Sequence, residues 1–333
     1  MRDVHGLLSP QLARAMTAAV EAGEKVILFL NRRGYASLLA CVHCGHTWTC
    51  PQCDVALAYF SRGDRLRCRI CGYYEPAPGV CPSCQSAELA RFGYGTEALE
   101  REVAGLLPGI ELLRLDSDVA SSFARLSGVL ERFAAPGSRV LVGTQMIAKG
   151  HHFPDVTLVG VVNADLTLRF PDFRAEERTF AMLVQVGGRS GRGERPGRVV
   201  VQTLDPEARP VALAAEHRSE EFYGGEIARR EQLGYPPARS LLAVEVSSPA
   251  ADKAAAGAEF VRDRLLAALR GGEAVVGPGP LSRERARYVA RLLVKSDELG
   301  DTLPVMRDLV ARYAARFARR DARLVIDVEP QWL

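Results

Sequence analysis

Eight cysteines occur as four Cys-x-x-Cys pairs within residues 41–84, and the rest of the 333-residue chain contains none. The pairs are Cys41/Cys44, Cys50/Cys53, Cys68/Cys71 and Cys81/Cys84. Two cysteines at this spacing form a tight turn that presents both thiolates to one metal ion, and two turns complete a tetrahedral zinc site. Disulfides would need an oxidising compartment, of which the sequence gives no sign, and an iron–sulfur cluster is the other alternative. The pattern therefore predicts two zinc ions per chain.

The four pairs can be combined into two sites in three ways. Five residues separate the first pair from the second, which is short for a loop that must return to the same metal, whereas fourteen separate the second from the third. The spacing favours a nested arrangement, with an inner zinc on Cys50, Cys53, Cys68 and Cys71 and an outer zinc on Cys41, Cys44, Cys81 and Cys84. His43 and His46 are possible substitute ligands, but eight thiols already suffice, which favours supporting or surface roles for both histidines.

Three loops outside the cysteine segment carry further chemistry. Residues 143–150 (Gly-Thr-Gln-Met-Ile-Ala-Lys-Gly) directly follow a run of strand type and combine hydroxyl, amide and ammonium donors, as in a phosphate cradle. His151 and His152 come next, and exposed polar histidines are the simpler interpretation than metal ligands. Gln185, Arg189 and Arg192 lie four and three residues apart, on one face of a helical turn. Two arginines directed at a cleft can neutralise a transferring phosphoryl group, whereas the alternative is a solvated surface helix.

These loops must be positioned by an alternation of strands and helices. Residues 25–30 form a continuous apolar run, typical of a strand buried on both faces, and Ser9-Pro10 predicts the start of the helix that precedes it. Further strands are predicted at 110–115, 139–142, 156–162 and 198–203, and helices at 96–107, 121–133 and 176–185. The alternation predicts an α/β fold with a doubly wound parallel sheet of RecA type, into which the zinc segment is inserted.

The composition changes at about Tyr235. From there, the pattern predicts strands at 241–246, 275–276, 287–294 and 323–328, and helices at 250–269 and 303–319. This β-α-β-β-α-β order predicts a small α+β domain. Its arginines at 283, 285, 287 and 291 are candidate DNA contacts, although a solvated face explains the charge pattern slightly better.

Composition excludes several protein classes. Apolar residues make up 47% and charged residues 25%, which excludes disordered, collagenous and coiled-coil proteins. No apolar run of about 18 residues or secretory signal is present, so we expect a cytoplasmic protein with no membrane partner. The net charge of +3, from 43 basic and 40 acidic residues, is too even to indicate nucleic-acid binding.

Together these motifs resemble the PriA family of replication-restart helicases. Residues 143–150 resemble motif V of superfamily 2 helicases, and Gln185 to Arg192 (Gln-Val-Gly-Gly-Arg-Ser-Gly-Arg) resemble motif VI. Residues 26–35 look like motif IV of PriA, the four-pair insert follows this segment, and Gly93 to Glu97 matches a segment beyond the insert. The resemblance covers nearly the whole chain. Its combination of motifs is specific to the family, whereas motif VI alone is generic.

The resemblance implies a function. PriA helicases recognise stalled forks, unwind DNA 3′→5′ with ATP and recruit primosome proteins, and single-stranded-DNA-binding protein is a further partner. Thr144, Lys149 and Arg32 would then contact DNA, whereas Arg189, Arg192 and Gln185 would reach ATP held with Mg²⁺ on another lobe. The implied domains are a RecA-like second lobe in two parts (1–40 and 91–230), the zinc module (41–90) and a C-terminal α+β domain (235–333).

One family feature is missing from this sequence. No Gly-x-x-x-x-Gly-Lys-[Ser/Thr] phosphate loop occurs, so the chain matches only the C-terminal half of PriA and, alone, is expected neither to bind ATP tightly nor to unwind DNA. Two hypotheses follow: a helicase part that is active only with the other lobe, or a non-catalytic zinc- and DNA-binding primosome scaffold. A third, a zinc ribbon from an unrelated nucleic-acid enzyme, requires motifs V and VI to be coincidental.

Overall fold

The structure is a computed structural model of the whole chain. It describes residues 7–30, 38–52, 55–60, 64–68, 70–92, 96–115, 119, 122–143, 153, 155–188, 196–269, 271, 273–284 and 286–331. The chain divides into two compact units. The parallel-sheet unit comprises Met1–His46, Gly79–Phe170 and Arg174–Phe222, and the C-terminal unit comprises Thr47–Pro78, Pro171–Phe173 and Tyr223–Leu333. Residues 41–90, expected as one zinc module, are therefore divided between the two units.

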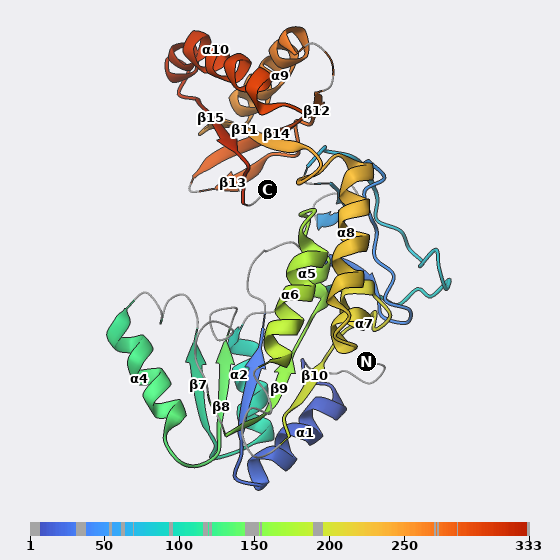
Figure 1. Cartoon of the computed structure of the whole chain (residues 1–333), viewed down its shortest axis with the longest axis vertical. Coiled ribbons are helices and arrows are strands. Elements are labelled where there is room, and N and C mark those ends of the chain that lie inside the picture. The colour runs from blue at the N-terminus through green and yellow to red at the C-terminus, as the bar shows by residue number, and fades with distance from the viewer. Residues whose placement is uncertain are drawn as a thin grey trace. The chain divides into compact units, whose positions relative to one another are not determined.

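The parallel-sheet unit contains a five-stranded sheet in the order β10-β9-β1-β8-β7, and every neighbouring pair is parallel. The strands are β1 (Lys25–Phe29), β7 (Glu111–Leu115), β8 (Arg139–Gly143), β9 (Val156–Val161) and β10 (Arg198–Val201). Figure 1 shows them side by side, with β1 in blue between β8 and β9. The expected parallel sheet is confirmed, and each of its five strands overlaps a predicted one.

Helices cover both faces of this sheet, which explains why β1 is apolar throughout. Val26 and Leu28 belong to a core shared with α1 (Pro10–Glu21) and α2 (Thr96–Leu106). Ile27 and Phe29 point to the other face, where their core is shared with α4 (Phe123–Ala134) and α6 (Ala175–Gly187). Because successive side chains of a strand alternate between faces, a strand buried on both sides cannot alternate in polarity.

Local chemistry at the start of α1 matches the sequence prediction. The Ser9 hydroxyl accepts a hydrogen bond from the Leu12 N–H at 3.2 Å, and Pro10 occupies the first helical position. This cap satisfies an N–H that the helix itself leaves without a partner. Farther along, α1 packs closely on the sheet because Gly160 of β9 has no side chain. A Cβ there would lie 2.8 Å from Leu12 Cδ1 and from Leu28 Cδ2.

The cysteine-rich segment is built from short strands. Its two ends pair as β2 (Leu38–Cys41) and β6 (Leu89–Phe92), which are antiparallel and belong to the parallel-sheet unit. Its middle forms a three-stranded antiparallel meander of β3 (Ala58–Phe60), β4 (Arg65–Arg67) and β5 (Tyr74–Pro76), which belongs to the C-terminal unit. The insert therefore supplies structure to both units.

The rest of the C-terminal unit is an antiparallel sheet in the order β12-β14-β11-β15, with β13 paired to β14. The strands are β11 (Ser240–Ser248), β12 (Ala274–Val276), β13 (Ser282–Glu284), β14 (Arg287–Ser296) and β15 (Arg323–Val328). One face packs on α9 (Ala251–Ala268) and α10 (Leu299–Ala318) through residues such as Val244 and Leu292. This is the expected α+β arrangement, with β13 as an addition that the sequence did not predict.

Among the helices that the structure describes, three were not predicted: α5 (Asp165–Leu168), α7 (Arg209–Ala215) and α8 (Ser219–Leu233). In α8, the carboxylate of Glu226 pairs with Arg230 one turn later at 2.9 Å. No helix in the described part of the chain is both long and apolar enough to cross a membrane.

Candidate metal centres

The first cysteine of each of the four pairs makes the same backbone hydrogen bond. In each, the N–H of the first cysteine donates to the carbonyl five residues later: Cys41 to His46 at 2.9 Å, Cys50 to Val55 at 2.8 Å, Cys68 to Tyr73 at 2.7 Å and Cys81 to Ser86 at 2.8 Å. The residue at the fourth position after the first cysteine is left-handed at Gly45, Gly72 and Gln85. Glycine adopts that conformation without strain, so the glycines at positions 45 and 72 are sequence signals of these turns.

The outer group brings together the thiols of Cys41, Cys44, Cys81 and Cys84, whose sulfurs all lie within 4.8 Å of one another. The Sγ atoms of Cys41 and Cys84 are 3.6 Å apart, and those of Cys44 and Cys81 are 3.5 Å apart. A disulfide needs about 2.05 Å. Sulfurs at about 2.3 Å from a tetrahedral zinc lie roughly 3.8 Å from one another. The separations therefore fit a zinc site and exclude disulfides.

The inner group contains Cys50, Cys68 and Cys71, again within 4.8 Å, with Sγ atoms of Cys50 and Cys71 3.6 Å apart. Cys53, expected as its fourth member, lies outside the described residues. The Ile70 N–H donates to the Cys68 sulfur at 3.4 Å. The seven described cysteines are thus grouped as in the nested arrangement that the spacing favoured.

The thiols of the outer group ionise unequally. Desolvation alone would raise the pKa of Cys81, but the backbone N–H groups of Cys84 and Ser83 donate toward its sulfur, and the pKa is lowered to about 7. At Cys44, a backbone hydrogen bond with His46 lowers the pKa, but desolvation and the neighbouring sulfurs together outweigh it and raise the pKa to about 12. Four thiolates cannot accumulate here without a cation, and a bound dication would supply that compensation.

Neither histidine near the outer group belongs to it. His46 Nδ1 lies 2.9 Å from the Ser83 hydroxyl, so its ring links the turns that carry Cys44 and Cys81. Burial and then the charge of Arg169 lower the pKa of His46, which favours a neutral ring. His43 is exposed. These positions fit the supporting and surface roles that were expected.

The outer group is fixed to the turn after β10. A Cβ at Gly45 would overlap the backbone carbonyl of Leu204, so the cysteine turn and that segment are in direct backbone contact. The Leu204 N–H in turn donates to the buried Asp165 carboxylate at 2.9 Å, and the Thr203 hydroxyl donates to the same carboxylate at 3.0 Å. Burial raises the pKa of Asp165 despite these bonds. This role of Asp165 could not be predicted, because the sequence shows only that the residue follows a strand.

The inner group is fixed to the C-terminal sheet in a similar way. A Cβ at Gly72 would lie 3.2 Å from the Pro278 carbonyl oxygen. Conversely, a Cβ at Gly277 would lie 3.3 Å from the Ile70 carbonyl oxygen. The turn that carries Cys68 and Cys71 therefore packs against the loop that follows β12.

The helicase-type residues fall mostly outside the described part of the chain. Thr144, Lys149, Arg32, Arg189 and Arg192 all lie there, as do His151 and His152. Gln185 is described: it lies near the end of α6 with its side chain exposed, whereas Phe180, Leu183 and Val186 of the same helix are buried.

Three of the four arginines suggested as DNA contacts are described, and each makes contacts within the chain. Arg291 pairs with Glu245 at 3.1 Å and with Glu284 at 3.0 Å, and Arg287 donates to the backbone carbonyls of Ser247 and Asp321. Arg283 lies over the Tyr288 ring, 5.8 Å from its centroid, and position 285 is outside the described residues. The intrachain bonds of Arg287 and Arg291 favour the alternative of a structural, solvated face.

Comparison with known proteins identifies relatives of this chain. Residues 50–76 match the family model "PriA DNA helicase Cys-rich region (CRR) domain", and residues 231–331 match "Primosomal protein N C-terminal domain". The chain is 37% identical over 97% of its length to the replication restart protein PriA of Bacillus subtilis. It belongs to the PriA family. The corresponding proteins of Haemophilus influenzae and Treponema pallidum are 35% and 37% identical over 98% and 97% of the chain.

The chain spans less than half of the length of these relatives. The matches cover 40%, 45% and 49% of the Bacillus, Haemophilus and Treponema proteins, respectively. What the sequence and the comparisons establish is a PriA part that carries the family's Cys-rich region and C-terminal domain. The Cys-rich region and the clustered thiols together indicate zinc binding.

Proposed function

We propose that this chain is the motor-lobe, zinc and C-terminal part of a replication-restart DNA helicase. The observation that carries the proposal is the nested grouping of the cysteines in a chain that also contains a parallel α/β sheet and is related to PriA proteins over nearly all of its length. The parallel-sheet unit is then a RecA-like second lobe. This assignment is supported by its strand order and by two sequences: that of motif V, which comes at the end of β8, and that of motif VI, which begins in the last turn of α6.

Within that lobe, Arg189 and Arg192 are proposed to reach ATP and Mg²⁺ bound on a separate lobe, with Gln185 beside them. Arginines there would stabilise charge on the transferring phosphoryl group. The exposed side chain of Gln185 supports a role directed outward from the sheet. Thr144, Lys149 and Arg32 are proposed to contact the DNA backbone, where hydroxyl and cationic groups act without regard to base sequence.

The proposed zinc count is two per chain, one in each cysteine group. Zinc held by four thiolates has no open coordination position, so its contribution is structural and not catalytic. Because so short a segment buries little apolar surface, the metal would supply much of the energy that folds it. Thiols kept reduced in the cytoplasm are the form that zinc requires.

The proposed substrates are branched forks and single-stranded DNA, and the proposed partners are primosome proteins and single-stranded-DNA-binding protein. The alternative is a non-catalytic zinc- and DNA-binding scaffold for the primosome. Both hypotheses use the same zinc centres, and they differ only in whether Arg192 takes part in ATP hydrolysis.

Reconstitution distinguishes them. The purified chain should show no DNA-stimulated ATPase alone, but should restore it when mixed with a separately produced lobe of a PriA relative that carries the Walker A loop. Arg192→Ala should abolish the restored activity, whereas Arg319→Ala, a change at an exposed arginine on the C-terminal unit, should not. Restored activity that survives Arg192→Ala would contradict the motor assignment. ATPase activity from the chain alone would show that the separate lobe with the Walker A loop is not needed.

A further inference from the structure

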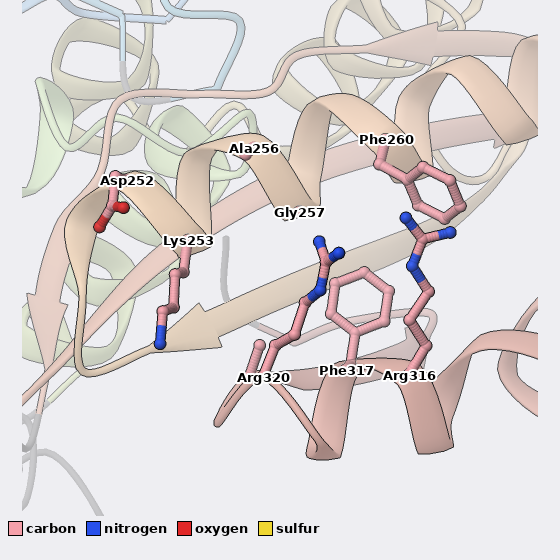
Figure 2. A pocket seen from close by; sticks show the side chains of 9 residues that line it. Asp252, Lys253, Ala256, Gly257, Phe260, Arg316, Phe317 and Arg320 are labelled. Atoms are coloured by element: carbon pink, nitrogen blue, oxygen red, sulfur yellow. The ribbon is translucent and has the colours of Figure 1, made fainter.

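A cleft of about 430 Å³ lies between α9 and α10 on the helical side of the C-terminal sheet. One stripe of α9 (Lys253, Ala256, Gly257 and Phe260) lines it, as do the last turn of α10 (Arg316 and Phe317) and Arg320 in the turn that follows. Figure 2 shows the side chains of Arg316 and Arg320 on either side of the Phe317 ring, both directed toward α9. The volume of the cleft is at the lower end of the range for cavities that hold small organic ligands, and it is larger than a single inorganic ion needs.

The floor of the cleft is apolar and closely packed. Phe317 and Ala322 are 6% and 5% exposed, respectively. The Phe317 ring packs directly on the backbone of α9, because a Cβ at Gly257 would lie 2.8 Å from Phe317 Cε1. A flat, weakly polar group could therefore be held against this floor without leaving a buried polar atom unpaired.

The rim, by contrast, is cationic. Lys253, Arg316 and Arg320 line it against a single carboxylate, that of Asp252. Over the residues that the structure describes, none of the three cations forms an ion pair. Other arginines on the same two helices do: Arg262 pairs with Glu259 and Asp263, and Arg312 with Asp308. The rim therefore carries an excess of positive charge, as in a site for an anion.

One of these cations is already oriented. The Arg316 guanidinium lies 4.4 Å from the centroid of the Phe260 ring, which holds it by a cation–π contact. A guanidinium stacked on a ring keeps its N–H donors in its own plane, where they can bind phosphate oxygens.

We propose that this cleft binds a nucleotide unit, with its phosphate at Arg316, Arg320 and Lys253 and its base over the apolar floor. The choice of a nucleotide among organic anions rests on the proposed function, in which DNA is the substrate. The unit could be supplied by a free nucleotide or by a single strand, and the two sources share the same chemistry.

The test uses the full zinc-loaded chain with two probes: a labelled oligothymidylate of about ten nucleotides, followed by anisotropy, and thymidine diphosphate, followed by calorimetry. Arg316→Ala combined with Arg320→Ala should weaken binding at least about tenfold, since each removes a charge-assisted hydrogen bond. The matched control, Arg307→Ala combined with Arg319→Ala, removes two exposed arginines of the same helix region that do not line the cleft, and it should change affinity less than about twofold. Asp252→Asn should strengthen binding, because it removes the opposing charge.

The oligonucleotide experiment has a second readout. The slope of log affinity against log salt should become shallower by about 0.7 for each phosphate that the chain no longer neutralises, and only in the cleft variant. The site is supported if either probe binds and only the cleft variant weakens that binding. The probe that binds shows whether the nucleotide unit comes from a single strand or from a free nucleotide. Failure of both probes, an equal effect of the two double variants, or binding only of an acidic peptide would overturn it. These outcomes do not depend on ATPase reconstitution, so a failed motor assignment would remain distinguishable.

Discussion

The contact between the outer cysteine group and the turn after β10 can be tested by adding a single Cβ atom at Gly45. Gly45 has φ of 75°, and a Cβ on it would overlap the backbone carbonyl of Leu204. Gly109, in the same unit, has φ of 84° but nothing within 4 Å of the position of its Cβ. Substituting alanine at each glycine therefore imposes the same backbone strain, about 1–2 kcal/mol, with the steric overlap at Gly45 alone.

The additional cost at Gly45 can be worked out from the neighbouring bonds. To admit a methyl group, the turn at Leu204 must move, which breaks the 2.9 Å hydrogen bond from its N–H to the buried Asp165 carboxylate. A hydrogen bond to a charged group contributes about 1.5–3 kcal/mol. We therefore expect Gly45→Ala to be less stable than Gly109→Ala by about 2 kcal/mol, or roughly 4–8 °C in the melting temperature of a unit of this size.

The assay is thermal unfolding of the zinc-loaded chain followed by circular dichroism, with release of zinc to a chelator as the second readout. Gly45→Ala should release one of the zinc ions faster than the wild-type chain, whereas Gly109→Ala should not. Equal melting temperatures for the two variants would refute the direct backbone contact between the cysteine turn and the Leu204 segment.

Three further changes test other parts of the structure. Cys68→Ser should lower the zinc content from about two ions per chain to about one, measured by atomic emission, and an unchanged content would contradict the separate inner site. Burial raises the pKa of Asp165, so the folded state holds its proton more tightly than the unfolded chain does. Stability should fall as pH rises from the unfolded pKa of about 4 through the higher folded pKa, and Asp165→Asn should flatten this dependence in denaturant titrations at several pH values. Lys295→Met should destabilise the C-terminal unit by about 1–3 kcal/mol, measured by unfolding in urea. The change leaves the Leu233 carbonyl without its 2.7 Å hydrogen-bond partner and removes a cation that lies 3.7 Å from the Tyr235 ring centroid. An unchanged urea midpoint would show that neither contact stabilises the unit.

The strands and long helices could be predicted because their burial imposes a local pattern of apolar residues. The apolar run of β1 has no polar position, since both of its faces are covered, and the pattern of α1 begins at a serine that caps it. Predicted ends were less accurate where a side chain replaces a backbone partner. Strand β10 ends at Val201 instead of the expected Thr203. At Gln202, which follows, the side chain accepts from the Ser9 N–H and donates to the Leu7 and Val162 carbonyls.

Elements without a burial pattern were missed. Helix α8 contains two adjacent glycines and many charges, so no apolar stripe marks it, and its ion pairs become visible only in three dimensions. Strand β13 pairs with β14 across a turn in which Ala286 has φ of 66°. Turn prediction relies on glycine or asparagine at such positions, and alanine gives no signal there.

The cysteine groups show where spacing is informative and where it stops. Loop lengths alone favoured the nested arrangement, because a short connection cannot return two turns to one metal. Spacing could not show that each group packs on a different sheet, since those contacts are made by backbone atoms: the Leu204 carbonyl against Gly45 for the outer group, and the Pro278 carbonyl against Gly72 for the inner one. A side chain at Gly45 would overlap the neighbouring backbone, and one at Gly72 would make a tight contact with it. A glycine at the fourth position of a cysteine turn therefore has two roles, since it both permits the left-handed turn and leaves room for the neighbouring chain.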